Sequence, residues 1–185
     1  MEVITLPGRD IWDSIVRNTR HATFFHSPAW ITILEKTYPG YRNNTRAFIF
    51  ENGSRAILPL MVERGRGVIF KKVKHKSMPL GVYGGIISAA QLSADERQAI
   101  FRHLTASDIH DLKLVAAPLD NQEYPAHFKR TPLLTHLLSL EDGFERIRGG
   151  FSRGQKSNIN QARKKGVTVR VGGTEEDYRR YFHIY

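Results

Sequence analysis

The residue types that could carry chemistry are concentrated between Gly149 and Val167, in the segment GGFSRGQKSNINQARKKGV. Its first part contains the G-x-S-x-G pattern that surrounds the nucleophile of many serine hydrolases, with Ser152 at the centre. The glycines are also typical of a phosphate-binding loop, and the basic side chains that follow could contact nucleic acid. The segment therefore allows three chemical interpretations.

The hydrolase interpretation is the weakest of the three. A nucleophilic serine of this kind follows an apolar strand, whereas the charged sequence DGFERIRGG precedes Ser152. The acid and histidine downstream, Asp177 and His183, lie within one short segment and leave little chain for the usual order of an acid and then a histidine. We therefore assign Ser152 no catalytic role, and the sequence identifies no other catalytic residue.

The same residues fit a helix with a basic face. Ser152 and Gln155 form a Ser-x-x-Gln capping box, which predicts a helix from Arg153 to Lys165 that ends at Gly166. No acidic residue occurs between Arg146 and Arg170. One side of the helix is basic or polar, and the opposite side is only thinly apolar; the basic or polar side comprises Arg153, Lys156, Asn160, Arg163 and Lys164. This face is either a phosphate contact or a merely solvated surface, and we favour the phosphate contact because a solvated helix would normally interleave Glu.

Composition narrows the possible partners and cofactors. The chain has 185 residues, a formal net charge of +10 and no cysteine, which favours polyanionic partners and excludes disulfides and thiolate chemistry. The eight histidines include no H-x-x-x-H pair, so we predict no metal site. The first twenty residues lack the apolar core of a signal peptide, and no apolar run is long enough to span a membrane. A cytoplasmic location is the default expectation.

The remaining elements predict an α/β fold in which helices pack on a mixed, largely antiparallel sheet. A strand at 3–6 and helices at 10–17 and from Ser27 to Tyr38 precede three antiparallel strands at 46–51, 56–63 and 68–73. A glycine-rich segment, a helix that begins with the capping box of Ser93 and Glu96, and strands at 112–116 and 133–140 follow; the second of these strands would bury His136. A short helix at 142–148 leads into the basic helix.

The last residues predict a strand at 167–171 and a helix that starts at Thr174. Such a strand and helix after a complete layer would begin another domain. Because the final residues Tyr181, Phe182, Ile184 and Tyr185 are apolar or aromatic, we expect the chain to be a fragment of a longer protein.

Three segments together resemble the FemAB family of bacterial acyltransferases, which are built from two domains of the GNAT (N-acetyltransferase-like) fold. FFHSPAWITILEKTYPGY is similar to the family's early helix, and MPLGVYGGII resembles its Pro-then-Tyr-Gly-Gly segment. LLSLEDGFERIRGGFSRGQKSNINQARKKGVTVRV resembles its interdomain stretch. The resemblance covers nearly the whole chain. It implies a GNAT-like first domain at 1–150, a basic linker helix at 151–166 and the start of a truncated second GNAT-like domain at 167–185.

The resemblance implies transfer of an aminoacyl or acyl group to an amine of a phosphorylated cell-envelope precursor, from the peptidoglycan or an exopolysaccharide pathway. The acceptor would be a phosphorylated or lipid-linked sugar-peptide. The donor of the full-length protein would be aminoacyl-tRNA or acyl-CoA. The coenzyme A loop, Q/R-x-x-G-x-G/A between a strand and a helix, is not found in place, so we expect this chain to bind no cofactor by itself. Whether it is active alone, and its oligomeric state, are not predicted.

The expected substrate-binding residues come from all three segments of the resemblance: Lys36, Tyr38, Tyr83, Gly84, Gly85, Arg153, Lys156 and Asn160. Lys156 and Asn160 depart from the family pattern, which often has arginine at the first position and a second basic residue at the other; an arginine would bind phosphate through two nitrogens. For the helix that begins at Ser27, the alternative to substrate contact is a capped helix that packs in the core. For the Tyr83–Gly85 segment, the alternative is a strand bulge. The alternative function is a nucleic-acid-binding module that uses the basic helix at 153–165.

Overall fold

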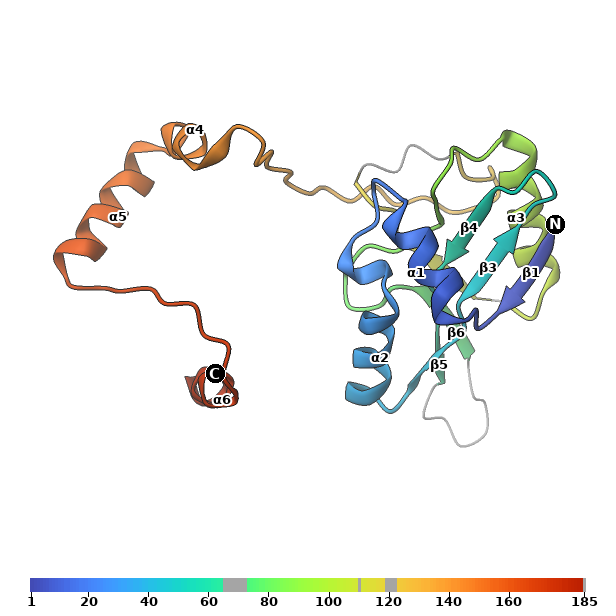
Figure 1. Ribbon diagram of the computed structural model, residues 1–185, viewed down its shortest axis with the longest axis horizontal. Coiled ribbons are helices and arrows are strands. Elements are labelled where there is room, and N and C mark those ends of the chain that lie inside the picture. Colours follow the sequence, from blue (N-terminus) through green and yellow to red (C-terminus); the bar gives the residue numbers. More distant parts are fainter. Residues whose placement is uncertain (65–72, 110, 119–122, 185) are drawn as a thin grey trace. The chain divides into compact units, whose positions relative to one another are not determined.

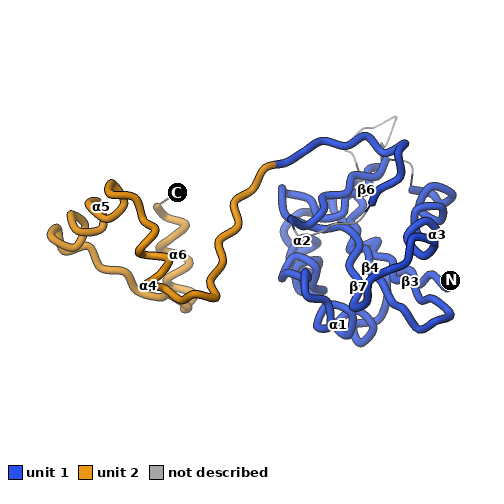
Figure 2. The backbone as a smooth tube through the Cα atoms, turned by 90° about the horizontal axis from the view of Figure 1, so that it is seen from above, with its two compact units in different colours: residues 1–133 blue, residues 134–185 orange. Residues whose placement is uncertain are grey.

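The computed structural model describes residues 1–64, 73–109, 111–118 and 123–184. Its contacts divide the chain into two compact units, Met1–Leu133 and Leu134–Tyr185, which Figure 2 distinguishes by colour. The first unit contains both β-sheets, and in the second the regular elements among the described residues are helices. The domain boundary expected near residue 150 stays a prediction.

In the first unit, one strand and three helical segments precede a run of six strands, and a helix and a last strand follow. The elements are β1 (Glu2–Thr5), α1 (Arg9–Arg17), the 3-10 turn η1 (Phe24–His26), α2 (Pro28–Thr37), β2 (Tyr41–Asn43), β3 (Arg46–Ile49), β4 (Arg55–Leu58), β5 (Met61–Arg64), β6 (Val73–Ser77), β7 (Ile87–Ser88), α3 (Ala94–Ala106) and β8 (Leu112–Leu114).

These strands form two four-stranded sheets, with the orders β1-β3-β4-β7 and β2-β5-β6-β8. Every pair in the first sheet is antiparallel, and Phe48 faces Ala56 across β3 and β4. In the second sheet only β6 and β8 run parallel, with His75 opposite Leu112. The predicted α/β class with largely antiparallel strands is thus confirmed, although the strands form two sheets and not one.

The two sheets meet at a corner where two short links, of two residues each, lead directly from a strand of one sheet into a strand of the other. The chain runs from β2 into β3 through Asn44 and Thr45, and from β4 into β5 through Pro59 and Leu60. At this corner the Asn44 amide donates to the Leu60 carbonyl over 2.8 Å, and the Leu60 amide donates to the buried Thr45 hydroxyl over 3.2 Å. The single strand predicted at 56–63 is therefore split at Pro59, whose ring nitrogen carries no hydrogen to donate.

Helices cover both faces of the first sheet, as Figure 1 shows. The sheet therefore lies between two clusters of core residues, one on each face. Phe48, Ala56 and Leu58 pack with Ile100 and Leu104 of α3. Their neighbours in sequence, Ala47 and Ile57, point the opposite way and pack with residues of α1 and α2: Trp12, Ile15, Ile31 and Leu34. Central strands buried on both faces produce the continuous apolar runs seen in the sequence.

The local signals for helix starts and turns are confirmed. The Ser27 hydroxyl accepts from the Trp30 amide at the start of α2, with Pro28 in the first turn. The Ser93 hydroxyl accepts from the Glu96 amide, and Glu96 accepts in return from the Ser93 amide. Gly53 occupies the β3–β4 turn with φ +84°, which explains the Asn-Gly signal.

The second unit contains α4 (Gly143–Gly149), α5 (Arg153–Lys164) and α6 (Glu175–Ile184). None of its described residues is buried. The strands predicted at 133–140 and 167–171 are wrong: both segments lack strand partners and are largely exposed, and so is His136. The predicted strand at 68–73 falls almost entirely outside the described residues, and the strand found there, β6, begins at Val73.

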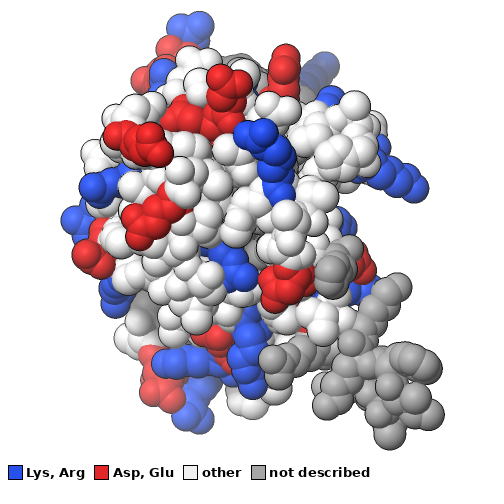
Figure 3. Space-filling view, turned by 90° about the vertical axis from the view of Figure 1, so that its right-hand side faces the viewer, with Lys and Arg blue, Asp and Glu red and all other residues white. Residues whose placement is uncertain are grey.

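Charge is distributed differently in the two units. The first unit has eighteen Lys and Arg against twelve Asp and Glu, and the second has ten against six in only 52 residues. On the face drawn in Figure 3, acidic and basic side chains lie beside one another. The acid-free run from Arg146 to Arg170 is thus the most one-sided positive segment of the sequence.

Candidate functional site

The helix α5 is held at both ends by the residues that predicted it. The Ser152 hydroxyl accepts from the Gln155 amide over 3.2 Å, and the Gln155 side chain accepts from the Ser152 amide over 2.8 Å. At the other end Gly166 has φ +74°, and the Val167 amide donates to the Ala162 carbonyl. Ser152 is thus a helix cap, which explains its G-x-S-x-G pattern without a nucleophile.

A hollow of about 310 Å³ lies between α4 and α5. It is lined by Glu145, Arg148, Gly149, Phe151, Lys156, Ile159 and Asn160. Lys156 and Asn160 are one helical turn apart, so both side chains lie on the same side of α5. The structure thus brings together two of the residues predicted from the basic helix, whereas Arg153 is not among the lining residues.

Lys156 also connects the two helices. Its ammonium group donates to the Gly149 carbonyl over 2.9 Å, at the end of α4, where helix carbonyls lack partners within the helix. This contact uses one of three ammonium donors and leaves two that can contact a ligand. Arg148 contributes a second positive charge, and its guanidinium lies 3.6 Å from the Glu145 carboxylate. The hollow therefore contains two cations, one carboxylate and the neutral amide of Asn160.

Arg153 is the first residue of α5 and is exposed. The first amides of a helix carry partial positive charge, which adds to the charge of the guanidinium. The hollow between α4 and α5 is also lined by an aromatic and an aliphatic side chain, Phe151 and Ile159. A phosphate with an attached apolar or sugar portion would fit this combination of groups.

Lys36 and Tyr38 lie at the end of α2, where a polar cluster forms that sequence reasoning missed. The Tyr38 ring packs edge-on against Tyr41, with 5.8 Å between the ring centres. The Lys76 ammonium lies 5.9 Å from the Tyr41 ring centre and 2.6 Å from a Glu63 oxygen. The hydrogen bond that the Lys76 ammonium donates to Glu63 raises the pKa of Lys76 above its usual value. This cluster could have been found from the pairing of β2 with β5, because the register of that pair places Tyr41 opposite Glu63.

The Tyr83–Gly85 segment has a structural reason for its two glycines. A Cβ at Gly84 would lie 2.2 Å from the Ser77 hydroxyl and 2.8 Å from its backbone carbonyl atoms. Gly85 has φ +91° and donates its amide to the same buried hydroxyl over 2.5 Å. The backbone that approaches Gly84 closely is thus the chain's own β6. Gly84 also lines a separate cavity of about 410 Å³ in the first unit.

Asp177, the acid considered for a hydrolase, caps α6. Its carboxylate accepts from the Thr174 hydroxyl over 2.8 Å and from the amides of Gly173 and Thr174, and it pairs with Arg170. These contacts, led by the Thr174 hydroxyl, hold the pKa of Asp177 far below its usual value. A carboxylate held in this way stabilises the helix start.

Within the described residues, no three His, Asp or Glu side chains are placed to hold a metal ion. None of the helices in this part of the chain has both the length and the apolar character needed to cross a bilayer. Comparisons with protein-family models, curated proteins and solved structures found no match for this chain.

Proposed function

We propose that the chain is the first domain and linker helix of a FemAB-like aminoacyl or acyl transferase of the cytoplasm. Its substrate would be an amine on a phosphorylated cell-envelope precursor, from peptidoglycan or exopolysaccharide synthesis. The observation that carries the proposal is the hollow between α4 and α5, which Lys156 and Asn160 of the acid-free helix α5 line together with Arg148 of α4. Phosphate groups bind well where ammonium and guanidinium donors converge.

The fold supports a GNAT-like interpretation of the first unit. The elements follow the order strand, two helices, six largely antiparallel strands shared between the two sheets, a helix and a strand, and the last strand, β8, pairs in parallel with β6. This order of strands and helices supports the GNAT-like first domain that the resemblance implies. The structure has a mixed α/β fold, and its assignment to the GNAT-like class is part of the proposal.

The chemistry assigned to these residues is binding and positioning. Lys156 and Arg148 would hold the phosphates of the acceptor, and Asn160 would donate its amide to a phosphate or sugar oxygen. Fixing the acceptor amine beside an ester or thioester carbonyl lowers the entropic part of the barrier. The donor, aminoacyl-tRNA or acyl-CoA, would be bound mainly by residues outside this chain, and we assign no general base.

The direct test is calorimetric titration with a nucleotide-sugar peptide precursor. Lys156→Ala should weaken binding about tenfold, because a hydrogen bond between charged groups is lost. Lys164→Ala is the matched control: it removes the same charge from the same helix, but Lys164 does not line the hollow. Equal losses for both variants would reduce the site to general electrostatic attraction. Absence of binding by the unsubstituted chain would overturn the proposal.

One observation also favours the alternative function, a nucleic-acid-binding module. Every basic residue of α5 is exposed, and the helix has no buried residue, so its whole surface is available to a phosphate backbone. This alternative predicts that log affinity for a duplex or tRNA falls linearly and steeply with log salt. It also predicts that Lys156→Ala and Lys164→Ala weaken binding equally, in contrast to the transferase proposal.

A further inference from the structure

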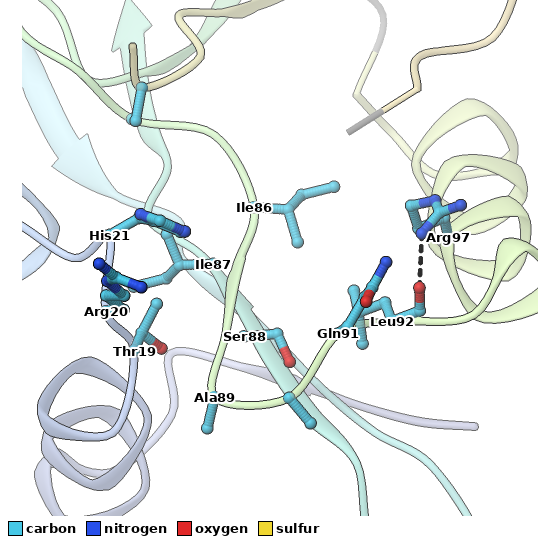
Figure 4. Close-up of a pocket in the computed structure, with 13 residues that line it drawn as sticks. Thr19, Arg20, His21, Ile86, Ile87, Ser88, Ala89, Gln91, Leu92 and Arg97 are labelled. Atoms are coloured by element: carbon cyan, nitrogen blue, oxygen red, sulfur yellow. Dashed lines mark hydrogen bonds between the residues drawn. The ribbon is translucent and has the colours of Figure 1, made fainter. Parts of the chain in front are cut away.

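A second cavity, open to solvent on one side, lies beside Gly84 in the first unit. It measures about 410 Å³, within the range of small-molecule sites, and lies between the chain that follows α1, the loop from β7 to α3, and the first turn of α3. Figure 4 shows Arg20 and His21 on one side, Arg97 on the other, and Ile86 and Gln91 between them. The cavity thus has two basic walls and a partly apolar floor.

The charges of this cavity have one sign. Two arginines and one histidine line it, and its described lining residues include no Asp or Glu. The nearby carboxylate of Glu96 is occupied elsewhere, because it accepts from the Ser93 amide and from the Asn52 side chain. An anion in the cavity would therefore meet positive charge without a competing carboxylate in the lining.

Arg97 is held in place before any ligand binds. One nitrogen of its guanidinium donates to the Leu92 carbonyl, the contact drawn as a dashed line in Figure 4. That bond uses one of five guanidinium donors and fixes the side chain along the wall. A planar group held in this way can contact two oxygens of a phosphate at a small cost in side-chain entropy.

The floor is apolar and well packed. Ile86, Ile87 and Leu92 are each at most 5% exposed, and they belong to the two core clusters of the sheet. Because these side chains are already shielded, the gain in free energy would come mainly from the aliphatic group of the ligand, in proportion to the area of that group that leaves water. The Gln91 amide can donate to, or accept from, a polar atom between the two ends of such a ligand.

We infer that this cavity binds a small phosphorylated molecule with a short aliphatic portion. Arg97 holds the phosphate, the aliphatic portion lies on Ile86 and Leu92, and Arg20 strengthens binding from the opposite rim. This site lies in the first unit and uses none of the residues assigned to the hollow between α4 and α5. Its test is therefore independent of the proposed function.

The experiment is titration of the full chain with hexyl phosphate, followed by calorimetry and by NMR of the backbone amides. Hexyl phosphate should bind at least tenfold more tightly than inorganic phosphate or hexanol, because only hexyl phosphate supplies both groups. Hexanoate, with a single charge and the same chain, should bind more weakly than hexyl phosphate. The amide signals of Gln91 and Leu92 should shift.

Variants complete the test. Arg97→Gln should weaken hexyl phosphate about tenfold, and Arg20→Gln by a smaller factor because Arg20 is exposed at the rim. Arg102→Gln, on the same helix α3 but outside the cavity, should leave affinity unchanged. Equal effects of Arg97→Gln and Arg102→Gln would overturn the site. Equal affinity for hexanoate and hexyl phosphate would overturn the assignment to phosphate.

Discussion

Replacing Gly84 with alanine should destabilise the first unit strongly, whatever ligand the protein binds. The new methyl group would lie 2.2 Å from the Ser77 hydroxyl and 2.8 Å from both the carbonyl carbon and the carbonyl oxygen of Ser77. Carbon atoms that are not bonded normally approach to about 3.5–4.0 Å, so the backbone of β6 or of the Gly84 segment must move. Movement would also disturb the 2.7 Å hydrogen bond from the Gly84 amide to the Val115 carbonyl.

The expected magnitude is at the upper end of the range for overpacked sites, about 3 kcal/mol. For a unit of this size that corresponds to a fall in Tm of about 10 °C, measurable by circular dichroism or calorimetry. Gly53→Ala measures backbone strain without a clash, because Gly53 has φ +84° and nothing lies within 4 Å of its added Cβ, whereas Gly84 has a close contact but no positive φ. It should cost about 1 kcal/mol.

A double variant separates the two kinds of contact at Gly84. Ser77→Ala removes the hydroxyl at 2.2 Å but leaves the backbone atoms at 2.8 Å, and it deprives the Gly85 amide of its acceptor. Ser77→Ala alone should therefore cost about 1–3 kcal/mol, and the double variant should be no more stable than Gly84→Ala. If the double variant matched Ser77→Ala, or if Gly84→Ala changed stability by less than about 1 kcal/mol, the close backbone approach would be refuted.

Four further changes have defined outcomes. Asn160→Arg places a second guanidinium in the hollow beside Lys156, so the precursor should bind more tightly in calorimetry, and an unchanged affinity would separate Asn160 from the phosphates. Glu96→Gln should lower stability at pH 7 by about 1 kcal/mol. The Ser93 amide, followed by the Asn52 amide, lowers the folded-state pKa of Glu96. The Glu96 carboxylate therefore stabilises the fold above the unfolded pKa of about 4.3, and this stabilisation is lost as pH falls through the lower folded pKa. In an acid titration followed by fluorescence, Glu96→Gln should make stability less dependent on pH in this range. Thr45→Val keeps the shape of the side chain but removes the acceptor of the Leu60 amide, and denaturant unfolding should show a loss of about 1–3 kcal/mol. Ser152→Ala should cost α5 about 1 kcal/mol and speed hydrogen exchange at the Gln155 amide, and unchanged exchange would contradict the cap.

Features set by neighbouring residues could be predicted from the sequence. The caps of α3 and α5 depend on Ser93 with Glu96 and on Ser152 with Gln155, which are three residues apart. The Asn52-Gly53 turn and the ending at Gly166 depend on the backbone freedom of one glycine each. Such signals need no knowledge of what packs against them.

Features that depend on distant residues could not be predicted. The apolar runs at 133–140 and 167–171 have the composition of strands, but a strand forms only where another strand offers hydrogen bonds, and these segments have none in this structure. The split at Pro59 depends on the hydroxyl of Thr45, fourteen positions earlier, which pairs with the neighbouring Leu60 amide.

The candidate site shows the same division. The spacing of Lys156 and Asn160 places them on one side of a helix, and both line the hollow. Arg148 and the Gly149 carbonyl depend on how α4 meets α5, which the sequence pattern does not reveal. For Gly84 the sequence pattern predicted substrate contact or a strand bulge, and it did not reveal that Ser77 lies against this glycine.

The corner at Asn44 and Leu60 has a consequence for how the first unit opens. Because the same two lengths of chain supply strands to both sheets, neither sheet can lose its strands without pulling on the other. The sheets should therefore form one cooperative unit in native-state hydrogen exchange, and the amides of Phe48 in one sheet and Val62 in the other should exchange with the same opening free energy. The corner hydroxyl of Thr45 thus contributes to the cooperativity of a whole domain as well as to one hydrogen bond.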